Sequence, residues 1–145
     1  MKCFDRQDLL DEWIEWSSTC QGNGTPAIMQ INHPGRQSSI GSGTRGYCEK
    51  ALAPSAVPLE FGPSMIAWAI RSFMFGTPQE MNLAQIETVI EQFVTAAKLA
   101  AKCGFKGVEV HAAHGYLLCE FVPSTVLHNT DLRQAQFCSP KVSDS

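Results

Sequence analysis

Apolar side chains recur at helical spacing in two long segments of the chain. In residues 5–19, DRQDLLDEWIEWSST, apolar residues fall on one side and acidic residues on the other, which predicts an amphipathic helix. A longer stripe in residues 82–103 predicts a second helix whose apolar face belongs to the core rather than to a cofactor site. The stripe consists of Ile86, Val89, Ile90, Phe93, Val94, Ala97, Ala100 and Ala101. Asn82 and Gln85 fit a capping box at its start, and Gly104 supplies the left-handed residue after which many helices end.

Short apolar runs precede and follow the second helix, and each predicts a strand. The first run is AIMQINH, residues 27–33, and the second is GVEVH, residues 107–111. A helix, a glycine, a tight turn and a strand form the second half of a βαβ crossover, so we expect the two strands to be parallel neighbours in one sheet. The pattern therefore predicts an α/β fold.

The segment between the first strand and the second helix, residues 34–81, is rich in Gly, Pro and Ser and has no clear period. A connecting loop of this length inside a compact domain is usually functional or disordered. Within it, SMIAWAIRSFMF (64–75) is apolar enough to predict a short packed helix or a lid. Residues 132–145 show no periodicity, so we expect one structured segment over residues 1–131 followed by a disordered tail.

Composition, charge and cysteine spacing argue against several classes of protein. Hydrophobic residues make up 44% and charged residues 17% of the chain, which is typical of a globular protein. A net charge of −3 gives no broad attraction to nucleic acid or to anionic membranes, and no apolar run approaches the ~20 residues of a membrane span. The acidic, polar start MKCFDRQDLLDEW is unlike a signal peptide, so we expect a cytoplasmic protein. The six cysteines are widely and irregularly spaced, which predicts free thiols and no structural zinc site.

The strand at residues 107–111 ends in a cluster of chemically active side chains. Its valines point to one face, whereas Glu109 and His111 point to the other. His111 stands at the carboxyl end of the strand, where α/β barrels place their catalytic groups. His114 and Tyr116 follow in a loop that contains a glycine and is free to turn. We therefore expect both imidazoles and the phenol to converge above one strand end.

These groups suit a carbonyl substrate. Two N–H donors can hold an oxygen on which negative charge develops, and a phenol can deliver a proton to the carbon that would otherwise carry the charge. On the first strand, Gln30 shares a face with Asn32. Its carboxamide offers both the donor and the acceptor that the pyrimidine edge of a flavin needs.

Each of these residues also has a simpler interpretation. His111 and His114 can be a buried, hydrogen-bonded pair without a task, or an accidental metal pair. Tyr116 can be a half-buried packing residue, and Gln30 a polar group at a strand end that the backbone satisfies. The HPGR turn, residues 33–36, either reaches a phosphate or substrate group through its basic side chains or is plain turn chemistry.

Three segments resemble the Old Yellow Enzyme family of NAD(P)H:flavin oxidoreductases: MQINHPGRQS (29–38), APSAVP (53–58) and above all CGFKGVEVHAAHGYLLCEF (103–121). This resemblance implies a TIM (β/α)8 barrel that binds FMN at the carboxyl ends of its strands. It also implies that NAD(P)H is the electron donor and that a small-molecule enone is the substrate. In this family the reduced flavin passes a hydride to the β-carbon of the enone, and a tyrosine protonates the α-carbon.

The resemblance assigns roles to individual residues by matching position. It implies that His111 and His114 bind the substrate oxygen, where the family uses either two histidines or a histidine and an asparagine. It makes Tyr116 the catalytic proton donor, and it makes Gln30 and His111 contacts of the flavin. The implied function is FMN-dependent reduction of the C=C bond of an α,β-unsaturated carbonyl, in small-molecule or secondary metabolism.

The chain departs from the family's pattern after Phe121. The family continues with a leucine-serine-proline turn and an arginine-threonine-aspartate run, of which VPSTVLHNTDLRQAQ keeps only Thr130-Asp131. The resemblance thus implies about a third of a barrel of roughly 250 residues, with two parallel strands, crossover helices and a long connecting loop. Because such a piece has open strand edges, we expect a second chain to complete the barrel. The alternative is a catalytically inactive, truncated remnant that is at most an interaction module.

Overall fold

The computed structural model describes residues 7–43 and 45–122, which include every residue that the sequence predicts for the active site. The predicted tail, residues 132–145, and the Thr130-Asp131 remnant lie outside the described residues. The described chain is an α/β structure whose strands pair in parallel, as the sequence predicts.

The chain divides into two compact units. The first unit combines the N-terminal residues through Ile31 with Ile86–Val110. The second combines Asn32–Gln85 with the residues from His111 onward. The boundary falls directly after each strand of the predicted parallel pair, so the loops that follow both strands belong to the same unit.

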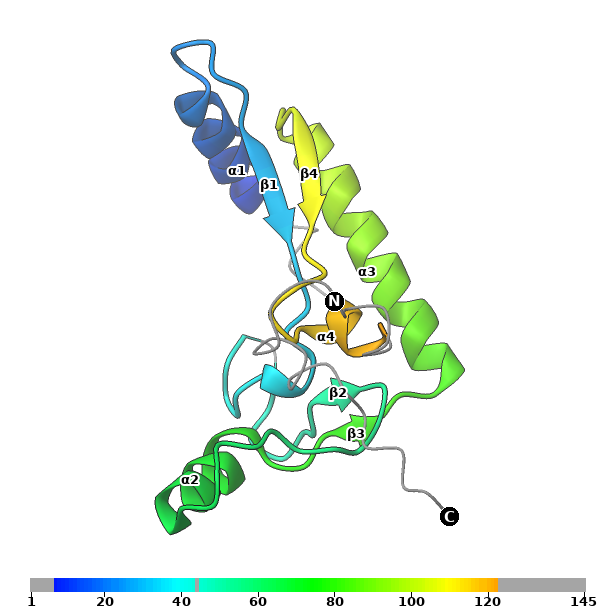
Figure 1. The fold of residues 1–145 in the computed structure, drawn as a ribbon. Coiled ribbons are helices and arrows are strands. Elements are labelled where there is room, and N and C mark those ends of the chain that lie inside the picture. The colour runs from blue at the N-terminus through cyan, green and yellow to red at the C-terminus, as the bar shows by residue number, and fades with distance from the viewer. Residues whose placement is uncertain (1–6, 44, 123–145) are drawn as a thin grey trace. The chain divides into compact units, whose positions relative to one another are not determined.

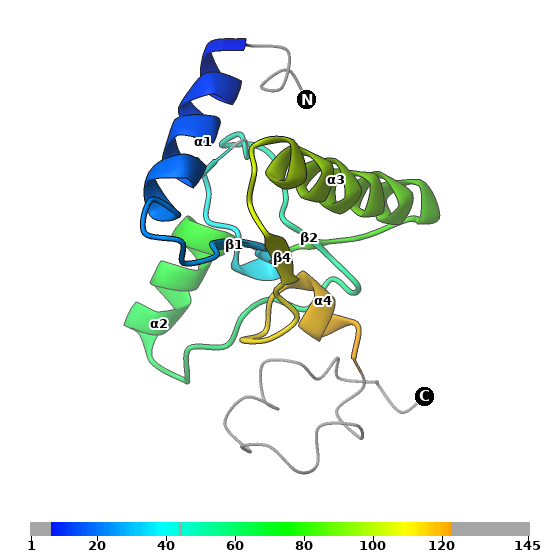
Figure 2. The same cartoon turned by 90° about the horizontal axis from the view of Figure 1, so that it is seen from above.

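In the first unit, strand β1 (Ile28–Ile31) pairs in parallel with strand β4 (Gly107–Val110). Helix α1 (Gln7–Cys20) and helix α3 (Leu83–Lys102) lie on the same side of the strand pair (Figures 1 and 2). The predicted parallel pairing is confirmed, and both strands are slightly shorter than the apolar runs that predicted them. The helices cover one face of the pair only in part, and the other face carries the exposed polar side chains of Gln30 and Glu109.

The end of α1 is bonded to the turn between α3 and β4. Gln21 Nε2 donates to the backbone oxygens of Ser17 and Gly104, each at 3.1 Å. Ser17 is 1% exposed, and the Trp16 ring meets the Phe105 ring edge-on at a centroid distance of 5.8 Å. Gly104 has a φ of 90°, which confirms the left-handed helix end that the sequence predicts.

The start of α3 carries the predicted capping box. Asn82 N donates to Gln85 Oε1 at 3.0 Å, and Gln85 N donates to Asn82 Oδ1 at 2.9 Å. Along the helix, Val89 and Ala100 are buried, whereas Ile90 is 57% exposed. The apolar stripe is therefore covered only in part by the described residues, because a pair of strands covers a narrow strip of the helix.

The second unit contains short elements within the segment that the sequence predicts as a loop. Strand β2 (Leu52–Ala53) pairs in parallel with β3 (Gln79–Glu80). Helix α2 (Met65–Ile70) continues directly into a π-helical turn, η2 (Arg71–Phe75), and a 3-10 turn, η1 (Gly35–Gln37), follows β1. The loop prediction was therefore incomplete, because strands this short cannot show an alternating pattern.

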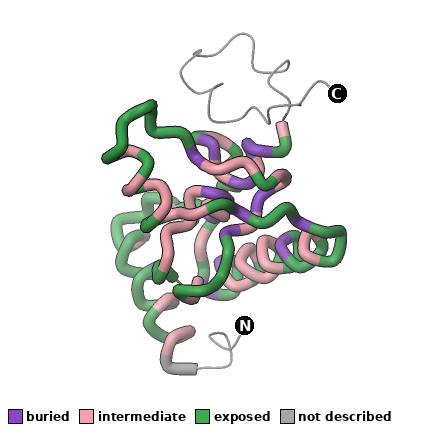
Figure 3. The backbone as a smooth tube through the Cα atoms, turned by 90° about the horizontal axis from the view of Figure 1, so that it is seen from below, coloured by how far each residue is buried: buried purple, intermediate pink, exposed green. Residues whose placement is uncertain are grey.

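In the second unit, none of the residues of α2 is buried, whereas Leu117, Cys119 and Glu120 of α4 (Leu117–Glu120) are buried. Figure 3 shows the buried residues of the described chain in purple. The buried apolar residues of this unit are Ala51, Ala53, Leu59, Pro78, Met81, Leu117 and Cys119. In contrast, Met65 is 86% exposed and Phe73 is 79% exposed. The predicted helix at residues 64–75 is confirmed; Phe75 packs against Phe61 at a ring-centroid distance of 5.6 Å, whereas most of the other apolar side chains of the segment are exposed.

The cysteines correct one prediction. Cys20, Cys48 and Cys103 are free thiols, whereas Cys119 is disulfide-bonded, which contradicts the expectation of free thiols throughout. Wide spacing in sequence does not prevent a fold from bringing two cysteines together. Across residues 7–43 and 45–122, no cluster of His, Cys, Asp or Glu is large enough to hold a metal ion. None of the helices in this part of the chain has the length and apolar character needed to cross a membrane.

Candidate active site

The loop after β4 brings its aromatic side chains together. His111 Nε2 lies 3.0 Å from His114 Nδ1, and the two ring centroids are 5.0 Å apart. The Tyr116 ring meets the His111 ring edge-on at a centroid distance of 5.1 Å. His111 is 9% exposed, whereas His114 is open to solvent. The structure thus places in one cluster the three residues that the sequence predicts for substrate binding and protonation.

Left-handed backbone at two successive residues produces this convergence. His114 has a φ of 58° and Gly115 a φ of 69°. A positive φ is uncommon in residues other than glycine, although histidine adopts it more often than most. Tyr116 then serves as the N-cap of α4 without using its side chain for the cap, so its hydroxyl stays available for other contacts.

The hydrogen bond between the imidazoles limits what the pair can donate. A neutral imidazole carries one N–H, so two neutral rings share two protons. One of these protons occupies the contact between His111 Nε2 and His114 Nδ1. The neutral pair therefore directs one N–H outward, from His114 Nε2 or from His111 Nδ1. The prediction of two donors for one oxygen requires either that this contact opens or that the pair takes up a proton.

The turn after β1 holds the backbone of the histidine loop. Leu117 N donates to the backbone oxygen of His33 at 3.0 Å. Gln37 Nε2 donates to the backbone oxygens of His114 at 2.7 Å and Gly115 at 2.9 Å. Two of these hydrogen bonds lie within the cluster, at His114 and Gly115, and one lies directly after it, at Leu117. The loop that carries the candidate active site is therefore anchored to one turn.

His33 has a defined protonation state. The backbone N–H of Gly35 donates to His33 Nδ1 at 3.1 Å, so this nitrogen is an acceptor and the ring proton lies on Nε2. Burial lowers the pKa of His33 and favours the same neutral form. The contact closes the HPGR turn, which supports the turn-chemistry interpretation for this residue.

Arg36 forms a buried pair with Glu120, a residue that sequence reasoning missed. Arg36 N donates to Glu120 Oε1 at 3.1 Å, and Arg36 Nε lies 3.7 Å from the same oxygen. The side chains are 10% and 5% exposed, respectively. Burial raises the pKa of Glu120 to about 7, against the smaller lowering effect of the hydrogen bond and charge of Arg36. The sequence feature that could have indicated a buried acid is the single glutamate among apolar neighbours in LLCEF.

Gln30 lies in the first unit on the polar face of the strand pair. Its Nε2 donates to Glu109 Oε1 at 3.1 Å, and both side chains are exposed. The register places these residues opposite each other on β1 and β4. The contact uses one of the two carboxamide hydrogens, so Gln30 keeps both a donor and an acceptor. An exposed carboxamide of this kind fits the pyrimidine edge of a flavin.

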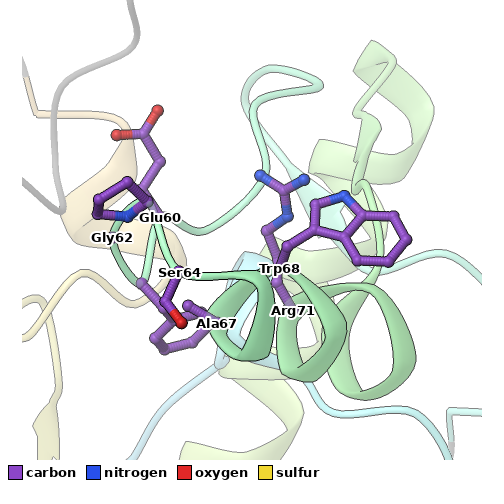
Figure 4. Close-up of a pocket in the computed structure, with 8 residues that line it drawn as sticks. Glu60, Gly62, Ser64, Ala67, Trp68 and Arg71 are labelled. Atoms are coloured by element: carbon purple, nitrogen blue, oxygen red, sulfur yellow. The ribbon is translucent and has the colours of Figure 1, made fainter.

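A separate pocket of about 460 Å³ lies beside α2 (Figure 4). Its lining consists of Glu60, Phe61, Gly62, Pro63, Ser64, Ala67, Trp68 and Arg71. Trp68 and Arg71 project from the helical segment side by side, with Glu60 on the opposite wall. The lining contains none of the residues that the sequence predicts for the active site.

Comparison with known proteins identifies the family. Residues 1–134 match the model of the NADH:flavin oxidoreductase / NADH oxidase family. The chain belongs to this family, the Old Yellow Enzyme family. This Old Yellow Enzyme chain is 49% identical over 123 residues to the NADH-dependent flavin oxidoreductase iliE of Neonectria sp. (strain DH2). It is 44% identical over 128 residues to the NADH-dependent flavin oxidoreductase iccE of Talaromyces variabilis, and 32% identical over 126 residues to 12-oxophytodienoate reductase 2 of Arabidopsis thaliana.

The matches cover most of the chain but only part of each relative. They span 85%, 88% and 86% of this chain, and 16%, 31% and 32% of the three relatives. The Old Yellow Enzyme chain thus corresponds to about a third or less of these proteins. The predicted family is therefore confirmed. It is a family of flavin oxidoreductases, and the relatives of this chain include proteins named for NADH and proteins named for NADPH. The roles predicted for Gln30, His111, His114 and Tyr116 remain predictions.

Proposed function

We propose that this chain provides the substrate-binding and protonating residues of an FMN-dependent NAD(P)H oxidoreductase that reduces the C=C bond of an α,β-unsaturated carbonyl. The observation that carries the proposal is the cluster in which His111 Nε2 lies 3.0 Å from His114 Nδ1 and Tyr116 packs against His111. A hydrogen-bond donor for an oxygen and a phenolic acid for a carbon are the groups that this reduction needs beside its hydride donor.

Each residue of the cluster has a separate task. The outward N–H of the histidine pair, formed by His111 and His114, holds the substrate carbonyl oxygen and stabilises the negative charge that develops there. When bound, FMN supplies the hydride that reaches the β-carbon, and NAD(P)H restores the reduced flavin. Tyr116 gives its phenolic proton to the α-carbon and regains one from solvent. The pair of histidines thereby lowers the energy of the charged state, and Tyr116 removes the charge.

Gln30 and His111 are the proposed flavin contacts. The exposed carboxamide of Gln30 offers a donor and an acceptor on the polar face of β1, and its hydrogen bond to Glu109 orients it. His111 adds a ring nitrogen at the start of the histidine loop. Both residues lie in segments that resemble the family, MQINHPGRQS and GVEVHAAHGY, within the residues 1–134 that match its model.

We place β1 and β4 as neighbouring strands of a TIM (β/α)8 barrel. Their parallel pairing, with α1 and α3 on one side, agrees with two βα units of such a barrel. Ile28 is 63% exposed and Val110 is 50% exposed within the described structure. Further strands would cover these residues, and they would come from a second chain or from the remainder of a longer protein.

Tyr116→Phe tests the proposed function in the FMN-loaded protein. Rapid-mixing absorbance measurements separate the reduction of the flavin by NAD(P)H from its reoxidation by 2-cyclohexenone. We expect the second step to slow by about 10²-fold or more, as for the loss of a general acid, while the first step stays within twofold of the wild type. Tyr47→Phe is the matched control, since Tyr47 is 83% exposed. Equal loss in both steps would contradict the role of Tyr116.

The second candidate function is that of a catalytically inactive remnant or interaction module. It is favoured by the apolar side chains that α2 exposes, which are typical of a surface that binds another protein. Titration with FMN, followed by the shift and sharpening of its visible absorbance band, separates the two candidates. No shift at saturating FMN, in a protein shown to be folded by circular dichroism, would favour the inactive form.

A further inference from the structure

We propose that Gln37 is a positioning residue for the histidine pair. Its carboxamide holds the left-handed backbone of His114, and this conformation brings the His114 ring to His111. The catalytic consequence of the proposal rests on the proposed function, in which the pair binds the substrate oxygen. The structural part, that Gln37 sets the geometry of the pair, does not depend on it.

The contact of Gln37 is specific to its carboxamide nitrogen. Gln37 Nε2 donates to the backbone oxygen of His114 at 2.7 Å and to that of Gly115 at 2.9 Å. A carboxamide nitrogen carries two hydrogens, one for each carbonyl. The two acceptors belong to the successive left-handed residues, with φ values of 58° and 69°. One side chain therefore satisfies both carbonyls of the unusual turn.

The left-handed conformation decides where the His114 ring lies. At a φ of 58° the ring nitrogen Nδ1 is 3.0 Å from His111 Nε2. A return of His114 to a negative φ would swing the ring away, and a separation beyond about 3.5 Å would end the hydrogen bond. Because this φ is unfavourable for a residue with a side chain, something outside the loop must favour it. The hydrogen bonds from Gln37 do so directly.

Gln37 can act as a support because its own turn is held in place. It is the last residue of η1, which begins at Gly35. Arg36 N donates to Glu120 Oε1 at 3.1 Å, so this turn is bonded to α4. The hydrogen bond from Leu117 N to the His33 oxygen, at 3.0 Å, joins the two segments a second time. The donor on Gln37 is thus fixed relative to the helix that follows the histidine loop.

A nuclear magnetic resonance experiment on the full chain tests the structural part. Gln37→Glu keeps the shape of the side chain but removes the N–H donors, and Gln37→Leu removes all polarity. The readouts are the three-bond coupling between the amide and α-hydrogens of His114, which reports φ, and the ¹⁵N shifts of the His111 and His114 rings. We expect both readouts to move away from the wild-type values in either variant. Gln79→Glu and Gln79→Leu are the matched controls, because Gln79 is exposed on β3 in the same unit.

Wild-type readouts in folded Gln37 variants would overturn the proposal. Should both variants unfold, the same substitutions in a His114→Gly background decide the question. Glycine adopts a positive φ without steric cost, so a folded double variant would show that Gln37 acts by supporting that conformation. A double variant that also unfolds would show a general structural role for Gln37 and would reject the proposal.

Ligand affinity tests the catalytic consequence. The probe is 4-hydroxybenzaldehyde, a phenol whose oxygen can occupy the place of a substrate oxygen, titrated calorimetrically into the FMN-loaded protein. We expect Gln37→Glu to weaken its affinity by about 10-fold, the loss of roughly one well-placed hydrogen bond, and Gln79→Glu to leave it unchanged. Equal affinity in the Gln37 variant and the wild type would reject the positioning role. A wild-type protein that binds no phenol would instead contradict the proposed function, while the resonance data would still decide the role of Gln37.

Discussion

The carboxylate of Glu120 lies against the backbone of Gly35. A Cβ on Gly35 would come within 2.6 Å of Glu120 Oε1, and Gly35 has a φ of 58°. The same carboxylate oxygen accepts the backbone N–H of Arg36. Glycine at this position therefore allows a buried acid on α4 to reach the turn that carries Gln37. Glycine is favoured at position 35 for two reasons: the backbone has a positive φ, and the Glu120 carboxylate occupies the place of a Cβ.

Gly35→Ala should destabilise the protein more than its φ alone explains. An alanine in the left-handed conformation destabilises the folded state by about 1–2 kcal/mol, and displacing the buried carboxylate adds about 1–3 kcal/mol. We therefore expect the free energy of unfolding, measured in urea, to fall by roughly 2–5 kcal/mol. Gly43→Ala is the matched control, because Gly43 has a φ of 59° and no atom lies within 4 Å of its would-be Cβ. Equal losses in the two variants would show that Glu120 moves aside without cost.

Glu120 should make stability fall as the pH rises. Its pKa of about 7 in the folded protein lies above the usual 4.5 of a glutamate, so the native state holds the proton more tightly than the unfolded chain. The stability contributed by this group is complete below pH 4.5 and is lost as the pH rises through about 7.

Glu120→Gln removes this titration. We expect the free energy of unfolding of the wild type to fall between pH 4.5 and pH 8, relative to that of the variant, by on the order of 1–3 kcal/mol. Urea unfolding at both pH values measures the difference. Glu80→Gln, at an exposed position on β3, should keep the pH dependence of the wild type. A Glu120→Gln protein with the same pH dependence as the wild type would mean that the carboxyl is not the source of the effect.

His33 should titrate at a lower pH than an exposed histidine. Burial lowers its pKa from 6.5, and Nδ1 is already an acceptor for the Gly35 N–H. The unfolded chain therefore binds this proton more readily, so the contribution of His33 to stability is present above pH 6.5 and is lost as the pH falls. A ¹⁵N titration should show a neutral ring with the proton on Nε2 at pH 6.5. A midpoint at or above 6.5 would contradict the assignment.

Local patterns and chain connectivity account for the parts of the fold that were predicted correctly. The capping box of Asn82 and Gln85 and the helix end at Gly104 depend on residues close together in sequence, so they can be recognised without the fold. The parallel pairing of β1 and β4 follows from the short turn between α3 and β4. The cluster of His111, His114 and Tyr116 could be predicted for the same reason, because the three residues lie in one short loop.

The contacts that hold the candidate site together could not be read from the sequence. Gln37 and His114 are 77 positions apart, and Arg36 and Glu120 are 84 positions apart. The two strands β2 and β3 were missed for a related reason, since each is too short to show a period and is defined by its partner. Similarly, no spacing rule assigned Cys119 to a disulfide.

By itself, the sequence determined the family, the main helices and strands, and the identity of the residues that meet at the end of β4. These features depend on side-chain periodicity, helix-end chemistry and neighbours a few positions away, all of which are written in the order of residues. The tertiary structure decided which groups support them: the carboxamide of Gln37 beneath the left-handed turn, the tautomer of His33 and the buried carboxyl of Glu120. Those features depend on burial and on contacts between distant segments, and such contacts exist only once the chain has folded.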